Sequence, residues 1–115
     1  MKAFSITAAL AAALAASTAS SVRAEQVFNR IASFAVADNL PEGADRKAAT
    51  SAEIIAASED GRTLVYTDSP GKRIGFIDIT DARAPAAGGT VSFEGEPTSV
   101  AIAGAKALVA INTRE

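Results

Sequence analysis

The sequence has no cysteine and no histidine among its 115 residues. Without them the fold has no disulfide framework, and Ser-His-Asp triads, Cys-His triads and the usual zinc sites are excluded. Tryptophan is also absent, aromatic residues make up 5% of the chain, and the formal net charge is -2. Neither a basic stripe nor a stacking platform is present, so nucleic acid is not an expected partner.

The first 24 residues have the pattern of a secretion signal. Lys2 supplies a positive charge, and residues 3–16 read AFSITAALAAALAA, an apolar run without charge. This run is shorter than the roughly 20 residues that span a bilayer, and small side chains precede a cleavage position before Glu25. We therefore expect a signal peptide over residues 1–24, a periplasmic or secreted location, and no membrane span after cleavage. An uncleaved anchor is the alternative.

The remaining residues alternate short apolar runs with turn signals and show no helical stripe, which is typical of an all-β protein. Charge, proline and glycine mark loops at residues 38–50 and 81–89, and Asp60 with Gly61 marks a tight turn. Strands are expected at residues 25–37, 51–57, 63–67, 73–79, 90–93, 98–102 and 108–112.

Two of these runs recur along the chain. Residues 53–57 moved forward by 45 positions fall on residues 98–102, and residues 64–68 moved by 44 fall on residues 108–112. A period of this length with four short strands is typical of a β-propeller, in which each blade is a four-stranded antiparallel sheet. A small β-sandwich or another all-β unit is the alternative.

Residues 62–102 resemble the YVTN-type propeller repeat, and the match extends over about residues 52–113. In that repeat a strand ending in Asn or Asp leads through a glycine-containing turn to a hydrophobic strand ending in Asp, and Gly-x-Pro precedes the next innermost strand. Asp68 and Asn112 match the first position, Asp78 the second, and residues 95–97 the third. The resemblance implies a fold and not an activity.

Three segments, SAEIIAAS, DSPGKRIGFIDIT and GEPTSVAI, carry a narrower resemblance. They are similar to the N-terminal propeller part of secreted bacterial proteins with an esterase-like-phytase region, or of choice-of-anchor propellers. This resemblance implies that any hydrolytic site would lie beyond residue 115.

The length bears on closure of the propeller. Removing 24 residues from 115 leaves 91, enough for about one full blade and parts of two others, whereas propellers close with about four to eight blades. We therefore expect a signal peptide followed by a partial β-propeller domain over residues 25–115, within a longer protein. Short subunits that assemble into a ring are the alternative.

Glu53 and Glu96 are the candidate ligand-binding residues. Each lies near the start of an expected innermost strand, where carboxylates at a channel mouth can meet Ca²⁺ or a cationic group. The alternative is that both are solvated charges at strand ends. Asp68, Asp78 and Asp81 are expected to cap loops by accepting backbone N–H bonds.

The residues predict an exported propeller that acts as a binding or scaffold module, with an unidentified ligand or protein partner and no catalytic residue evident in this part. The alternative is the propeller portion of a secreted phosphoesterase or esterase of the esterase-like-phytase kind.

Overall fold

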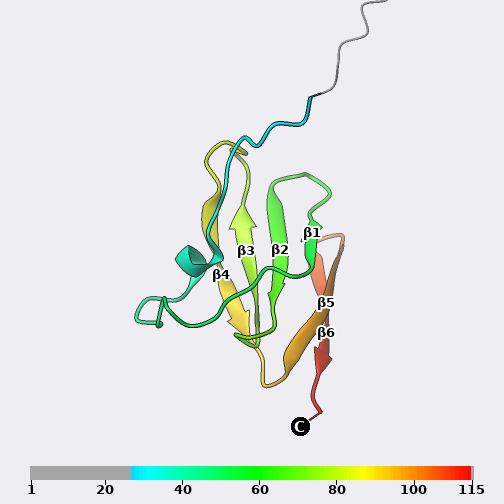
Figure 1. Cartoon of the computed structure of the whole chain (residues 1–115). Helices are drawn as coiled ribbons and strands as arrows, with labels where there is room; N and C mark the ends of the chain where they lie inside the picture. The colour runs from blue at the N-terminus through cyan, green and yellow to red at the C-terminus, as the bar shows by residue number, and fades with distance from the viewer. Residues whose placement is uncertain (1–26, 115) are drawn as a thin grey trace, which may run out of the picture.

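In a computed structural model, which describes residues 27–114, the chain forms two antiparallel sheets (Figure 1). The expected all-β class is confirmed, and the expected signal peptide at residues 1–24 lies outside the described residues. The strands are β1 (Ile55–Ala57), β2 (Thr63–Asp68), β3 (Arg73–Asp78), β4 (Ala86–Ser92), β5 (Glu96–Ala103) and β6 (Lys106–Asn112), and η1 (Val36–Asn39) is one turn of 3-10 helix.

The first sheet is a meander with strand order β1-β2-β3-β4, and β5 pairs with β6 in a second sheet. The strands of the first sheet form where β-branched and aromatic residues are frequent, as in TLVYTD of β2 and RIGFID of β3. The predicted turn at Asp60 and Gly61 separates β1 from β2, with Gly61 at a φ of 67°. None of the described residues belongs to a helix with the length and apolar character needed to cross a bilayer.

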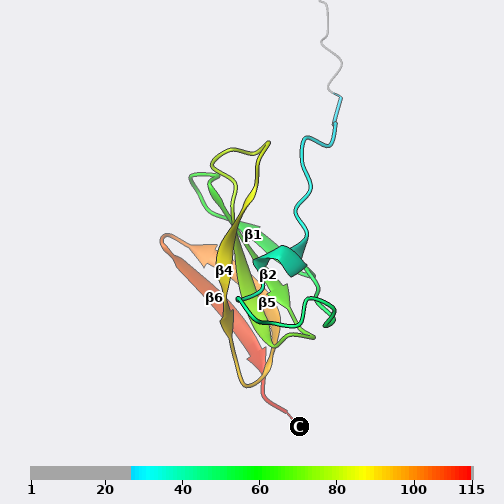
Figure 2. The ribbon, with the colours of Figure 1, turned by 90° about the vertical axis from the view of Figure 1, so that its left-hand side faces the viewer.

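Both faces of the first sheet are covered. Val65 and Ile74 point to one face, where they pack against Val100 of β5. Tyr66 and Ile77 point to the opposite face, because side chains alternate along a strand. There they meet η1 and the segment that precedes it. Figure 2 shows η1 on one side of the sheet and β6 on the other.

The second hairpin repeats the first with one constant spacing. In the first sheet Ile55 pairs with Tyr66, Ala56 with Val65 and Ala57 with Leu64. Adding 44 to both numbers of each pair gives three pairs found between β5 and β6. These are Ser99 with Ala110, Val100 with Val109, and Ala101 with Leu108. The shift is thus 44 residues for both strands, and the expected shift of 45 for the inner strand is one residue too long.

Asn39 fastens the N-terminal segment to the first sheet. Its side chain is 3% exposed, and its Nδ2 lies 3.0 Å from each of three acceptors, the Tyr66 hydroxyl and the carbonyls of Phe76 and Gly89. The Gly89 N–H donates in turn to the Asn39 Oδ1 over 2.9 Å. This buried amide therefore joins η1 to β2, β3 and β4.

The expected strand at residues 25–37 is wrong over its described part. Residues 27–35 are extended without belonging to a strand, and residues 36–39 form η1. The apolar pattern suited a strand, but no described strand pairs with this segment. Its side chains stay exposed instead, by 66% at Val27, 96% at Phe28 and 62% at Ile31.

The expected loop at residues 81–89 is too long. β4 begins at Ala86, so alanine and glycine residues that favour a loop are in a strand. Pairing with β3 overrides that preference, and a register shift between Gly75 and Ile77 fits the two strands together. Gly88 lies so close to the Phe76 backbone that a Cβ there would approach its carbonyl oxygen to 2.8 Å.

Replacing the buried amide tests its role in the fold. Asn39→Ala leaves the Tyr66 hydroxyl and the Gly89 N–H without their partner, so we expect the free energy of unfolding to fall by about 2 kcal/mol. Urea denaturation measures the change. The control is Asn29→Ala, the same substitution at an exposed position, which should change the stability by less than about 0.5 kcal/mol. Equal losses in the two variants would contradict the role of Asn39.

The single tyrosine offers a second test, because the chain has no tryptophan to obscure its absorbance. Burial raises the Tyr66 pKa above 10.0, and the Asp68 charge adds to the rise, although the Asn39 hydrogen bond opposes it. The folded state therefore holds this proton more tightly than the unfolded state. Its contribution to stability is complete below pH 10.0 and is lost as pH rises through the folded pKa. Tyrosinate absorbance should show a higher midpoint in buffer than in urea, and equal midpoints would contradict this.

Candidate functional site

The two predicted glutamates lie at the same end of the molecule. Ser69 follows β2, and its Oγ lies 2.7 Å from Glu53 Oε2 and 2.9 Å from the carbonyl oxygen of Pro97. Pro97 is the second residue of β5 and directly follows Glu96. The Ser69 hydroxyl therefore links the approach to β1 with the start of β5, and these two strands begin side by side.

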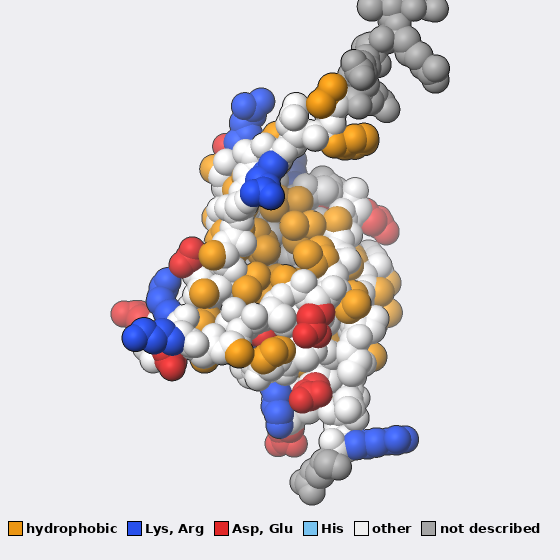
Figure 3. Space-filling view, in the orientation of Figure 1, with side chains coloured by type: hydrophobic (Ala, Val, Ile, Leu, Met, Phe, Trp, Pro, Cys, Tyr) orange, Lys and Arg blue, Asp and Glu red, His pale blue; other side chains and the backbone are white. Residues whose placement is uncertain are grey.

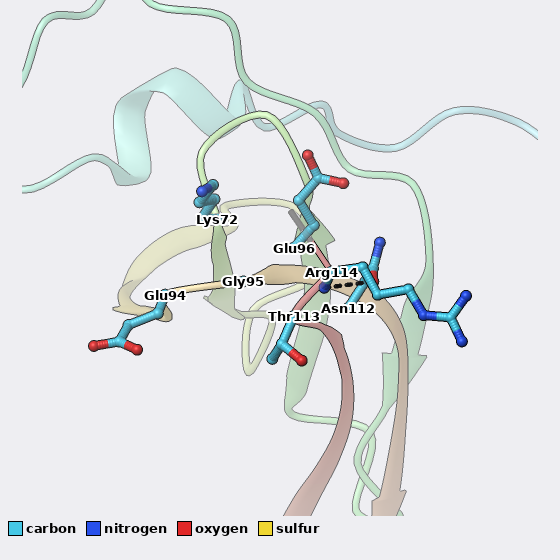
Figure 4. Close-up of a pocket in the computed structure, with 7 residues that line it drawn as sticks. All are labelled: Lys72, Glu94, Gly95, Glu96, Asn112, Thr113 and Arg114. Atoms are coloured by element: carbon cyan, nitrogen blue, oxygen red, sulfur yellow. Dashed lines mark hydrogen bonds between the residues drawn. The ribbon is translucent and has the colours of Figure 1, made fainter.

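Glu96 lines a surface hollow of about 300 Å³ beside the start of β5 (Figure 4). The hollow carries two carboxylates and two cations, and its lining residues are Lys72, Glu94, Gly95, Glu96, Asn112, Thr113 and Arg114. Figure 4 shows the carboxylates of Glu94 and Glu96 pointing away from each other, and the Arg114 guanidinium pointing away from both. The charges line one hollow without converging on one point.

The Ca²⁺ hypothesis requires several oxygen ligands that converge on one point. Ca²⁺ takes six to eight oxygens, with carboxylates prominent among them. Within residues 27–114, no group of three His, Cys, Asp or Glu side chains is arranged to hold a metal ion. Binding of Ca²⁺ or of a cationic group at Glu53 and Glu96 stays a prediction, and the described part of such a site consists of these two carboxylates.

The aspartate at the end of β2 is the most highly bonded charge at this end. Asp68 is 1% exposed, and its Oδ2 accepts a bond of 2.8 Å from the Arg73 Nε. Its Oδ1 accepts from the backbone N–H of Ser51 at 2.9 Å and of Gly71 at 3.3 Å. A Cβ at Gly71 would collide with the Arg73 guanidinium. Asp68 thus joins the β2–β3 turn to the segment before β1, and the sequence did not reveal Arg73 as its partner.

The other two predicted caps are confirmed at exposed turns. The Thr80 N–H donates to Asp78 over 2.8 Å, and this bond holds the Asp78 pKa below its ordinary value. The Arg83 N–H donates to Asp81 over 3.0 Å. All three aspartates that were expected to cap loops therefore have a structural task.

Two further hollows are mainly apolar. One of about 300 Å³ separates the N-terminal segment from the first sheet, with Phe34, Leu64 and Ile77 among its lining residues. Another of about 200 Å³ lies between the two sheets, beside Val65 and Ile102. Figure 3 shows hydrophobic side chains gathered on the face that the N-terminal segment crosses. Because their linings are mainly apolar, both hollows are better explained by incomplete packing between layers than by a polar binding site.

No family model matches the sequence, and no curated protein or solved structure matches it either. Function must therefore be inferred from the chain's own repeat and contacts.

The two ion pairs of the described chain offer a matched test of the Asp68 role. Asp68→Ala leaves the Arg73 guanidinium, whose side chain is 15% exposed, without its partner, and we expect a loss of about 3 kcal/mol in the free energy of unfolding. Asp38→Ala removes the same kind of contact from the exposed Asp38–Arg46 pair and should cost less than about 1 kcal/mol. Urea denaturation of the two variants would measure both changes in the free energy of unfolding. A smaller loss for Asp68→Ala than for Asp38→Ala would refute the structural role.

Proposed function

We propose that this chain is an exported β-propeller module that serves binding or scaffolding. The observation that carries the proposal is the constant shift of 44 residues between the strand pairs of the two hairpins. A β-propeller is built from four-stranded antiparallel sheets repeated at about this period. The first sheet has the strand number and order of one blade, and β5 with β6 has the register of the next blade's first two strands.

The path of the chain between the sheets supports a blade-to-blade transition. β4 and β1 lie at opposite edges of the first sheet. Residues 93–95 lead from β4 to β5, which packs over β1 and β2. In a propeller the outermost strand of one blade leads to the innermost strand of the next in the same way. Val65, Ile74 and Val100 form the core between the two sheets.

The polar side chains form hydrogen bonds that hold turns, and this structural role favours binding or scaffolding over hydrolysis. Asp68, Asp78 and Asp81 hold turns, and Ser69 bonds Glu53 and the Pro97 carbonyl. The Asp68 and Ser69 contacts order the loops beside the hollow that Glu96 lines, whereas Asp78 and Asp81 hold turns at the opposite end of the first sheet. Ordered loops on a rigid scaffold are the usual means by which a repeat fold presents a binding surface. A ligand or protein partner would meet the module there.

Fractionation followed by electron microscopy tests the proposal. Export predicts that the protein purified from a bacterial host is found in the periplasm or medium, without residues 1–24 by mass spectrometry. The propeller predicts a ring of stacked sheets around a central channel in electron cryo-microscopy of that material.

Three results would count against the proposal. An isolated sandwich of two sheets would refute the propeller, and a cytoplasmic, unprocessed chain would refute export. Hydrolysis of p-nitrophenyl phosphate or p-nitrophenyl acetate by the same material would refute a purely binding role and favour the phosphoesterase or esterase. We expect no hydrolysis above that of a sample inactivated by heat.

A further inference from the structure

An apolar hollow of about 300 Å³ separates the N-terminal segment, residues 27–39, from the first sheet. Its lining comes from residues 31–34, from Leu64 and Ile77 of the sheet, and from Ile79, Ala82 and Pro85 of the loop between β3 and β4. Among these described residues Ser33 alone is polar, and none is charged. Small-molecule sites are lined mainly by apolar side chains, and this volume is at the lower end of their range. The hollow therefore suits a small ligand with an apolar body.

Side chains, and not a backbone ladder, hold the layer over the hollow. No backbone hydrogen bond joins residues 27–34 to another described residue. Ala32 and Phe34 are half-buried beside the sheet. The Asn39 amide fastens the segment at its other end. A ligand can thus enter between the segment and the sheet without breaking backbone hydrogen bonds.

Arg62 lies on the same face of the first sheet as the hollow. Leu64 pairs with Ile77, and both side chains line the hollow. The Ile79 N–H donates to the Arg62 carbonyl over 2.8 Å, so the pairing continues past the start of β2. Because side chains alternate along a strand, Arg62 points to the face of Leu64, beside Ile79. The exposed Arg62 guanidinium is therefore at the margin of the apolar lining.

Arg30 lies at the margin of the same hollow in the other layer. It directly precedes Ile31, which lines the hollow. Arg30 shares one side of the extended segment with Ala32 and Phe34, whose half-burial shows that this side turns toward the sheet. Figure 3 shows Lys or Arg side chains at the upper margin of the hydrophobic patch on this face.

Three aspartates at this end of the first sheet have other partners or point away. Asp60 and Asp81 accept hydrogen bonds from backbone N–H groups of their own turns, over 3.1 and 3.0 Å. Asp78 points to the opposite face of the sheet, because side chains alternate along β3. Neither Arg30 nor Arg62 belongs to the two ion pairs found among residues 27–114. Their guanidinium groups are thus available to an anion from solution.

We propose that this hollow binds the alkyl chain of a fatty-acid anion, whose carboxylate meets Arg62 and Arg30 at the margin. Apolar space that water fills poorly is filled favourably by an alkyl chain. A ligand with polar groups along its body would lose hydrogen bonds in this lining, which is costly. Guanidinium groups bind carboxylates through charge-assisted hydrogen bonds. The site lies at the opposite end of the first sheet from the Glu96 hollow, so it does not rest on the proposed propeller.

Methyl NMR of the purified full chain tests the site with decanoate, kept below the concentration at which it forms micelles. Decanoate should shift the methyl signals of Leu64, Ile77 and Ile79 until they saturate. Ile102 lines the apolar hollow between the two sheets, and its methyl signals are the internal control that should not move. Octanoate, which is shorter by two methylenes, should bind about tenfold more weakly. Decylammonium, which carries the opposite charge, should bind more weakly than decanoate.

Two substitutions separate the alkyl contact from the charge contact. Ala32→Leu occupies part of the hollow and should weaken decanoate binding at least about tenfold, while the melting temperature by circular dichroism is unchanged or higher. Arg62→Glu should weaken decanoate binding at least about threefold and strengthen decylammonium binding. The matched control is Lys47→Glu, which makes the same change of charge at an exposed position outside the lining and should leave both affinities unchanged.

Several outcomes would overturn the proposal. Shifts that do not saturate, equal shifts at Ile102, or unchanged affinity in a folded Ala32→Leu variant would show that the alkyl chain does not enter this hollow. Equal affinity for decylammonium, or an unaffected Arg62→Glu variant, would contradict a fatty-acid anion as the ligand. A propeller that fails to bind decanoate would overturn the inference and leave the proposed function standing.

Discussion

The first sheet must bury two faces at once, and the rest of the structure depends on this constraint. Val65 and Ile74 require an apolar layer on one side, which β5 supplies through Val100. Tyr66 and Ile77 require cover on the other side, which the N-terminal segment supplies. An antiparallel sheet with one solvated face would have needed only one of these layers. Two covered faces instead make the sheet the middle layer of a stack.

Buried polar contacts fix the position of η1 on the first sheet and the conformation of the turn between β2 and β3. Asn39 satisfies hydrogen-bonding groups on three strands, and it holds η1 against an otherwise apolar face. Asp68 serves the ends of β2 and β3 in a similar way through Arg73 and two backbone N–H groups. Buried polar groups are costly without partners, so these two side chains favour one arrangement of the loops. The end of the molecule that carries Glu53 and Glu96 is ordered as a result.

The strand pairs of the first hairpin recur in the second hairpin at a constant spacing. The hairpin β1–β2 recurs as β5–β6 after 44 residues, and the sequence of residues 29–38 recurs at residues 72–81 after 43 residues. Both spacings are close to the length of one repeat.

The sequence by itself determined the all-β class, the turn at Asp60 and Gly61, the strands β2 and β3, and the three aspartate caps, because alternation and turn chemistry are local. Tertiary structure decided the unpaired state of residues 27–35, the early start of β4, the Asn39 bonds and the divergence of Glu94 from Glu96. Each of these depends on residues far apart in the chain. A strand needs a neighbouring strand, and a buried amide needs acceptors that only the folded sheet brings together.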